Sequence, residues 1–267
     1  MMLYQYEHIA RDETLSLISG IIQRVAPLDE NAPETLAMLG YVKLILEWDW
    51  ENAELCYQKS LAANPNYVIA RSRYSNLLML SGRFSESLAH LRAVLAFDPL
   101  SIPANVTLGR VFYVTEQFDN AIIQLEETLE LERKNYPALL LLGAALAARG
   151  RYDAALKAFY DIRDWQNNIE TLSMIGYTFA LGGQENEAQR VIKQIESQAA
   201  EKDLDATNLA YIHVALGETK KAFEYFEKSF IQRSTNLIGV KVDPRLKPIN
   251  RDAKFKNLVC RIGLSTD

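Results

Sequence analysis

The feature that most constrains the fold is a spacing of 33 or 34 residues that repeats along most of the chain. One small residue marks it at six positions, separated in turn by 34, 34, 34, 33 and 34 residues: Ala53, Ser87, Ala121, Ala155, Ala188 and Ala222. A period of this length indicates stacked supersecondary units, because a single unit buries its apolar face only against its neighbours. The sequence therefore predicts a repeat array rather than one compact domain.

The stretch 135–163 shows the repeated unit most clearly. Two apolar helical runs flank a turn at Gly150, with Gly143 in the first run and Ala155 and Phe159 in the second. A glycine inside a helix costs about 1 kcal/mol relative to alanine, which is tolerable if its missing side chain lets the paired helix approach. We expect Ala155 to supply the matching small surface and Phe159 to fill the gap against the next unit.

The pattern predicts six helix–turn–helix units, with residues 1–32 before them as a capping helix or a degenerate repeat. Residues 235–267 are expected to form a C-terminal capping segment and helix that turns Phe255, Leu258 and Val259 inward. The six units are 33–65, 67–99, 102–134, 136–168, 169–202 and 203–234.

The first unit is one residue longer than the later ones. Gly40 and Ala53 are 13 residues apart, whereas Gly143 and Ala155 are 12 apart. We place the extra residue in the turn, where the sequence Glu-Trp-Asp-Trp at 47–50 replaces the short glycine turn of the later units.

This arrangement resembles the tetratricopeptide repeat, which has two helices per 34 residues and small residues at its eighth and twentieth places. The resemblance covers residues 33–232 and implies an all-α fold, a right-handed α-α superhelix of about 13–14 helices. The tryptophan often found at the family's fourth place is missing here, where the chain has Leu36, Arg71, Asn105, Leu139, Leu172 and Ala206.

The tail at 241–264, KVDPRLKPINRDAKFKNLVCRIGL, is similar to the end of bacterial tetratricopeptide regions that follow a winged helix, a nucleotide cyclase or a kinase. Those regions close on a similar Asp-Pro-Arg, a Phe-containing helix and Gly-Leu. The resemblance implies a bacterial chain that is either a stand-alone adaptor or the regulatory region of a larger signalling or transcription protein.

Composition and charge exclude several classes of function. The net charge of −5 argues against a general nucleic-acid coat. Two cysteines are too few for a disulfide framework, and the sequence has neither a secretory signal nor an apolar run long enough to span a membrane. These observations favour a cytoplasmic location. The stretch from Lys241 to Arg261 contains seven basic residues and only two acidic ones, and we interpret it as a solvated terminal helix.

The sequence offers no catalytic or cofactor chemistry. His8, His90 and His213 have no partners at metal-ligand spacing. A nucleophile elbow, a Walker A loop and a dinucleotide fingerprint are all missing. We expect no enzyme activity, no cofactor and no metal.

The family resemblance implies a peptide-binding groove along the first helices of the units. Its second, fifth, ninth and twelfth places give Tyr41, Asn76, Arg110, Tyr113, Tyr177 and Tyr211 as candidate groove residues. Tyrosine rings supply contact area, while Asn76 and Arg110 suit a peptide backbone or carboxylate. The alternative is that the tyrosines only pack between neighbouring first helices. The chaperone-tail clamp of the family is disfavoured, since Asn76 alone matches it.

The predicted function is a non-catalytic scaffold that binds a protein or peptide partner. Two alternatives stay open: the regulatory region of a larger bacterial protein, and a module that associates with itself through its exposed ends. We expect a monomer or weak homodimer, without direct nucleic-acid or membrane contact.

Overall fold

The computed structural model describes residues 31–199 and 205–266, so the predicted capping helix at 1–32 lies almost wholly outside the described residues. The described residues hold thirteen α-helices and no strand, which confirms the all-α class. The chain divides into two units: unit 1 is 1–104, 235–242 and 259–267, and unit 2 is 105–234 and 243–258.

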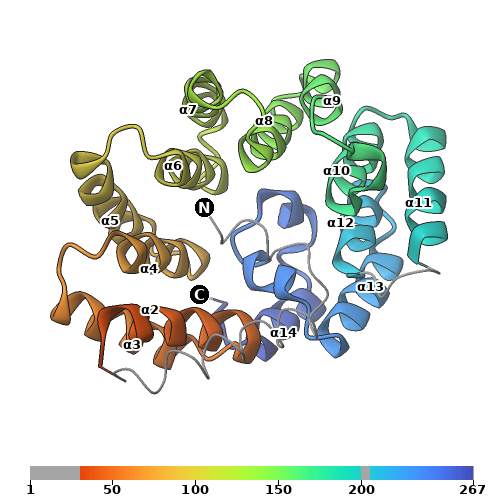
Figure 1. Cartoon of the computed structure of the whole chain (residues 1–267). Helices are drawn as coiled ribbons and strands as arrows, with labels where there is room; N and C mark the ends of the chain where they lie inside the picture. Colours follow the sequence, from red (N-terminus) through yellow and green to blue (C-terminus); the bar gives the residue numbers. More distant parts are fainter. Residues whose placement is uncertain (1–30, 200–204, 267) are drawn as a thin grey trace. The chain divides into compact units, whose positions relative to one another are not determined.

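Unit 1 contains two antiparallel helix pairs, α2 with α3 and α4 with α5 (Figure 1). Asp49 caps α3 by accepting a hydrogen bond from the Asn52 amide. The elements are α2 (Pro33–Val42), the π-helix η2 (Lys43–Glu47), α3 (Trp50–Ala63), α4 (Val68–Leu80), α5 (Phe84–Phe97) and the 3-10 helix η4 (Thr235–Gly239). Two helices cross the boundary between the units, α6 (Ile102–Val114) and α14 (Ala253–Arg261).

The extra residue of the first helix–turn–helix repeat (33–65) lies in the first helix of that repeat and not in its turn, which corrects our expectation. The last turn of that helix widens into the π-helix η2, where the Trp48 amide donates to the Lys43 carbonyl. Trp48 then adopts a left-handed φ of 57°, the conformation that Gly82, Gly150, Gly183 and Gly217 adopt at the same place in later turns. A π-helical turn absorbs one residue without shifting the second helix.

Unit 2 pairs α8 with α9, α10 with α11 and α12 with α13. Asn135 and Asn168 cap α8 and α10 through their side-chain oxygens. The elements are α7 (Phe118–Leu131), α8 (Tyr136–Ala148), α9 (Tyr152–Tyr160), the 3-10 helix η3 (Trp165–Asn167), α10 (Ile169–Leu181), α11 (Glu185–Ala199), α12 (Thr207–Ala215), α13 (Thr219–Ile231) and the 3-10 helix η5 (Pro244–Ile249).

Three mid-helix glycines, Gly40, Gly109 and Gly143, receive the large residue of their own second helix, whereas Gly176 lies against Ile212 of the following first helix. A Cβ atom on Gly40 would lie 2.8 Å from the Tyr57 ring, and one on Gly143 would collide with Phe159. The sequence correctly predicts the close approach, but the partner differs: Phe159 fills the glycine gap within its own unit.

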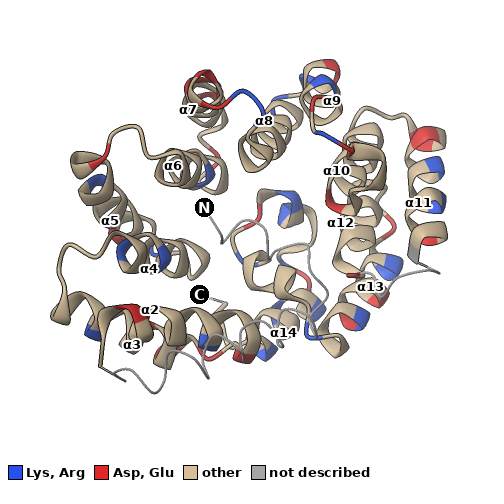
Figure 2. Ribbon diagram, in the orientation of Figure 1, with Lys and Arg blue, Asp and Glu red and all other residues tan. Residues whose placement is uncertain are grey.

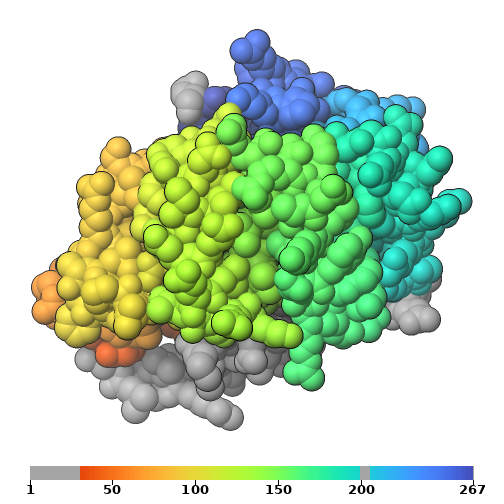
Figure 3. Space-filling model, turned by 90° about the horizontal axis from the view of Figure 1, so that it is seen from above, coloured from red at the N-terminus to blue at the C-terminus, as the bar shows by residue number. Residues whose placement is uncertain are grey.

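Charge separates the two kinds of helix in unit 2. The helices α11 and α13 carry many Lys, Arg, Asp and Glu residues, whereas α8 and α12 carry none (Figure 2). In the space-filling view, the side chains from α8 to α11 meet without a gap (Figure 3). The second helices α11 and α13 therefore form the solvated side.

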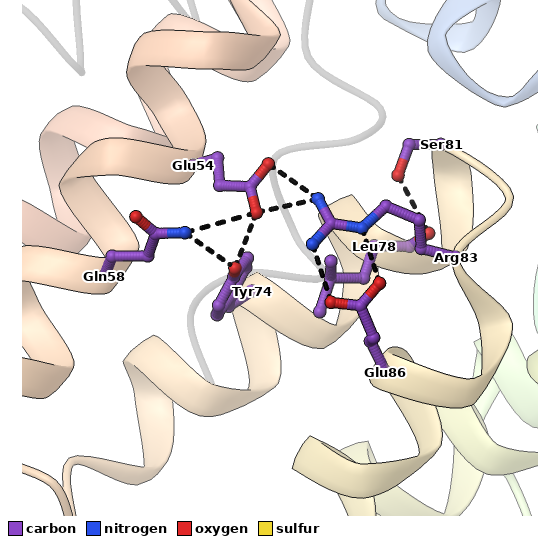
Figure 4. Close-up of polar contacts among 7 residues, drawn as sticks. All are labelled: Glu54, Gln58, Tyr74, Leu78, Ser81, Arg83 and Glu86. Atoms are coloured by element: carbon purple, nitrogen blue, oxygen red, sulfur yellow. Dashed lines mark hydrogen bonds and ion pairs between the residues drawn. The ribbon is translucent and has the colours of Figure 1, made fainter.

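A polar cluster joins the two helix pairs of unit 1 (Figure 4). Glu54 on α3 accepts hydrogen bonds from Arg83 Nη1 at 2.7 Å and from the Tyr74 hydroxyl at 2.6 Å. Gln58 donates to the Tyr74 hydroxyl at 3.1 Å, and Arg83 also pairs with Glu86 at 2.7 Å. One carboxylate thus ties α3 to α4 and to the start of α5.

Candidate peptide-binding surface

The six predicted groove residues divide between the two units. Tyr41 and Asn76 belong to unit 1, and the other four, Arg110, Tyr113, Tyr177 and Tyr211, belong to unit 2.

Three of the unit 2 residues form a buried set, which we call the tyrosine cluster. Tyr113 ends α6, Tyr177 lies in α10 and Tyr211 lies in α12, and their exposed fractions are 5%, 9% and 6%. Tyr177 and Tyr211 occupy the same place of successive first helices, so the repeat itself aligns them on one face. Arg110 is half-buried on α6.

A segment of the chain's own tail lies against this cluster. The Arg245 guanidinium carbon is 3.7 Å from the Tyr211 ring centroid and 6.0 Å from that of Tyr177, both within cation–π range. Its Nη1 donates to the Met174 sulfur at 2.8 Å. Arg245 Nη2 also pairs with Asp243 Oδ2 at 2.6 Å. We call residues 243–245 the Asp-Pro-Arg segment.

The segment is preorganised by its own residues. The Asp243 carboxylate accepts the Arg245 backbone amide at 2.9 Å and so caps η5, and Pro244 occupies the first helical position. Leu246 and Ile249 then anchor η5, with exposed fractions of 1% and 4%. Bonds within the segment itself therefore hold Asp243 and Arg245 in the turn in which they contact the tyrosines.

Burial and the nearby charges shift the pKa values of these groups. Burial raises the pKa of Tyr177 to about 12. Burial raises the pKa of Tyr113 and of Tyr211 well above 10, and the Asp243 carboxylate raises both further. Burial alone would lower the pKa of Arg245, but Asp243 and Tyr211 hold it well above its ordinary value. Arg245 stays charged and the tyrosines stay neutral across the physiological range.

Two first helices of unit 2, α10 and α12, are buried on all sides. Every residue of α10 from Thr171 to Thr178 is buried, as is every residue of α12 from Thr207 to Val214. Second helices cover one side of each, and η5 packs against α12. The first-helix face that the sequence predicts as a groove is contacted by the tail at Tyr177 and Tyr211.

The basic residues of the terminal helix α14, Lys254, Lys256 and Arg261, are exposed as expected, whereas two basic residues before that helix make contacts of their own. The Arg245 side chain is only 18% exposed. Lys247 is exposed, but its ammonium pairs with Glu116 at 2.6 Å. Phe255, Leu258 and Val259 are buried, as the sequence predicts for the capping helix.

In unit 1 the predicted residues are partly open to solvent. Tyr41 and Asn76 are half-buried, and the Arg73 guanidinium stacks 5.0 Å above the Tyr41 ring. Arg73 Nη1 also donates to the Ala37 carbonyl at 2.9 Å, and burial lowers the pKa of this arginine. Sequence reasoning missed Arg73, because its sixth place in the unit is not one that the family resemblance assigns to the groove.

The described part of the chain holds neither of two further kinds of site, a metal centre and a membrane span. Within 31–199 and 205–266, no three His, Cys, Asp or Glu side chains gather closely enough to hold a metal ion. No helix in these ranges is long and apolar enough to cross a membrane.

Several solved structures are similar to this chain. A tetratricopeptide repeat protein from Parabacteroides merdae has a TM-score of 0.63 at 16% identity, over 92% of this chain and 89% of its own. A thermophilic tetratricopeptide protein of Thermus thermophilus has a TM-score of 0.60 at 17% identity, over 69% and 99%. PilW, a type IV pilus biogenesis factor, has a TM-score of 0.59 at 16% identity, over 85% of this chain and 98% of its own. At these identities the likeness shows the fold alone.

Sequence comparison points to the same family. A search of curated proteins gives no match. Two family models, both described as tetratricopeptide repeat, match residues 49–102 and 106–168 and residues 206–230, together more than half of the chain. The chain therefore belongs to the tetratricopeptide repeat family.

Proposed function

We propose that this protein is a non-catalytic interaction scaffold that binds a polypeptide segment of a partner on the inner faces of its first helices. The observation that carries the proposal is that the tyrosine cluster already holds a polypeptide segment, residues Asp243–Arg245 of the same chain. A surface that accommodates the charged side chains of a folded chain segment has the chemistry of a peptide site.

The partly open inner surface of unit 1 is where a partner first makes contact. Tyr41, Arg73 and Asn76 are half-buried there, so each keeps some solvent-exposed area. Arg73 offers a planar cation and Asn76 an amide, groups that hydrogen-bond a carboxylate or a peptide backbone. The Tyr41 ring adds apolar contact area at low entropic cost.

Affinity capture from the native lysate tests this function. The full chain is compared with the double variant Tyr41→Ala/Asn76→Ala and with Leu55→Ala. Leu55 is a matched apolar residue of unit 1 that is 44% exposed on the second helix α3. Circular dichroism and thermal melting check that each variant is folded.

We expect a protein that the wild type and Leu55→Ala retain and that the double variant loses, as measured by quantitative mass spectrometry. Equal retention by all three folded proteins would contradict binding on the inner faces. Empty lanes for all three would contradict the scaffold function itself.

A further inference from the structure

We propose that the tyrosine cluster is a recognition site for polypeptide segments that carry an aspartate two positions before an arginine. The chain's own Asp-Pro-Arg segment is its resident occupant, and a partner with the same chemistry binds by exchange with it. The inference rests on the proposed function and names the partner's chemistry.

The surface that receives the segment carries no charge of its own. The groups in contact with Arg245 are the Met174 sulfur and the rings of Tyr177 and Tyr211, and the pKa values of both tyrosines lie far above neutrality. Within the described residues, every ion pair of Arg245 is made with Asp243. The carboxylate that balances the arginine therefore comes from the bound segment and not from the repeats.

A neutral, largely buried surface selects for a self-neutralised pair. A lone arginine placed there would lose water without gaining a counter-charge, and such a loss is costly. The Asp243 carboxylate lies near the same ring, because it raises the pKa of the Tyr211 hydroxyl. Aspartate and arginine two positions apart neutralise each other while the guanidinium lies on the Tyr211 ring.

The spacing of the pair follows from backbone geometry. Pro244 fixes its own φ and starts η5, and the Asp243 side chain accepts both the Arg245 amide at 2.9 Å and the Arg245 Nε at 3.0 Å. A segment with the two residues adjacent would not place both contacts on one carboxylate oxygen. The site therefore reads the order acid, any residue, arginine.

Exchange requires only a local opening of the tail. The Asp243 and Arg245 side chains are 11% and 18% exposed, so the pair lies at the edge of the packed region. Leu246 and Ile249 are buried and anchor η5 next to the pair. Local openings of this kind cost less than global unfolding. The tethered segment competes at an effective concentration in the millimolar range, so wild-type protein binds an external segment weakly.

The test uses a fluorescent peptide with the sequence of residues 240–250, VKVDPRLKPIN. Its binding to the full chain is followed by fluorescence anisotropy. The double variant Asp243→Asn/Arg245→Gln keeps both side chains polar and removes both charges, so that no unpaired charge is left buried. We expect this variant to bind the peptide about tenfold or more tightly than wild type, since charge-assisted hydrogen bonds of the resident no longer compete.

Three comparisons make the result specific. Peptides with the arginine changed to glutamine, or the aspartate to asparagine, should lose about tenfold in affinity. Adding Tyr211→Leu to the double variant should abolish the gain. Equal binding of the glutamine peptide by the folded double variant overturns the proposal, as does competition by free arginine at the same concentration as the peptide.

A second measurement uses unmodified protein and therefore still tests the proposal if the double variant does not fold. Hydrogen exchange of the Arg245 and Leu246 amides should accelerate when millimolar peptide is added and stay unchanged with the glutamine peptide. Unchanged exchange with both overturns the proposal. A lysate partner retained equally by wild type and Tyr211→Leu would leave the scaffold function standing and overturn only this assignment.

Discussion

At the scale of single residues, the fold depends on a few glycines that admit a large side chain. A Cβ on Gly109 would lie 2.8 Å from Leu125, and one on Gly143 would collide with the Phe159 ring. Both partners have an exposed fraction of 0%, so neither has room to move. Each pair locks the two helices of a unit face to face, which is why the glycine persists where helix propensity disfavours it.

Replacing Gly143 by valine should therefore overpack the interface. We expect Gly143→Val to lower the free energy of unfolding by about 1–3 kcal/mol, measured by urea denaturation. Ala148→Val is the control, since Ala148 is exposed on the same helix α8, and should cost only about 0.5 kcal/mol through helix propensity. Equal losses would show that the Phe159 contact does not limit the packing.

The buried tyrosines make stability depend on alkaline pH. Burial raises the pKa of Tyr177 to about 12 and those of Tyr113 and Tyr211 well above 10. The unfolded chain releases these protons near its ordinary pKa of about 10. The folded-state pKa values are raised, so their contribution is complete below about pH 10 and is lost as pH rises further.

We expect the free energy of unfolding to fall above about pH 10, by about 1.4 kcal/mol per pH unit for each such tyrosine. Denaturant unfolding at several pH values measures it, and phenolate absorbance follows ionisation. If all 13 tyrosines titrated together near pH 10 while the helical signal stayed intact, the prediction would fail.

At the scale of helices, polar side chains join one helix pair to the next. Glu54 on α3 contacts both Tyr74 on α4 and Arg83 before α5, whereas Glu86 contacts Arg83 from within α5 (Figure 4). The Glu54 side chain is 23% exposed and that of Glu86 is 56% exposed. Of these two carboxylates, Glu54 is the one whose contacts cross between pairs, and it is also the less exposed one.

Glu54→Gln should destabilise unit 1 more than Glu86→Gln. We expect a loss of up to about 1 kcal/mol for Glu54→Gln and a value near zero for Glu86→Gln, because exposed ion pairs contribute little. A double-mutant cycle with Arg83→Met isolates the Glu54–Arg83 term. A larger loss at Glu86 than at Glu54 would contradict this account of the junction.

At the scale of the whole molecule, the C-terminal chain is built into both units. Residues 235–242 and 259–267 belong to unit 1, and residues 243–258 belong to unit 2. In unit 1 the Trp50 indole donates to the Ile262 carbonyl at 2.7 Å, across 212 positions of sequence. The next residue, Gly263, has a φ of +84°, and a Cβ there would lie 3.0 Å from the Trp50 ring. The turn after the first helix thus receives the end of the tail.

Substituting Gly263 tests how much the contact between the end of the tail and Trp50 stabilises the protein. We expect Gly263→Ala to cost more than Gly150→Ala, whose φ of +73° is similar but whose Cβ would meet open space. Gly150→Ala is the control and measures only the cost of placing a Cβ atom on a left-handed backbone, about 1–2 kcal/mol. The additional loss of stability in Gly263→Ala measures the contact with Trp50. Thermal unfolding of both variants gives the difference, and equal losses would mean that the tail end adds no packing.

The sequence by itself determined the repeat. The spacing of the small residues from Ala53 to Ala222 locates the helix pairs, and the glycines mark where helices approach, because both effects are local and recur in every unit. It also marked Tyr177 and Tyr211 as residues of one face. It misplaced the extra residue near Gly40, since a π-helical turn and a longer loop have the same length in the sequence.

Only the tertiary structure decided what lies against that face. Arg245 is in sequence one of seven basic residues of a tail expected to be solvated, yet it is half-buried against Tyr211. Its partners Met174 and Tyr211 precede it by 71 and 34 positions, in helices that carry no mark of a cation site. Periodicity reports contacts between neighbouring repeats, whereas the tail lies outside the period. Its docking is fixed by burial, ring geometry and charge pairing that exist only once the chain has folded.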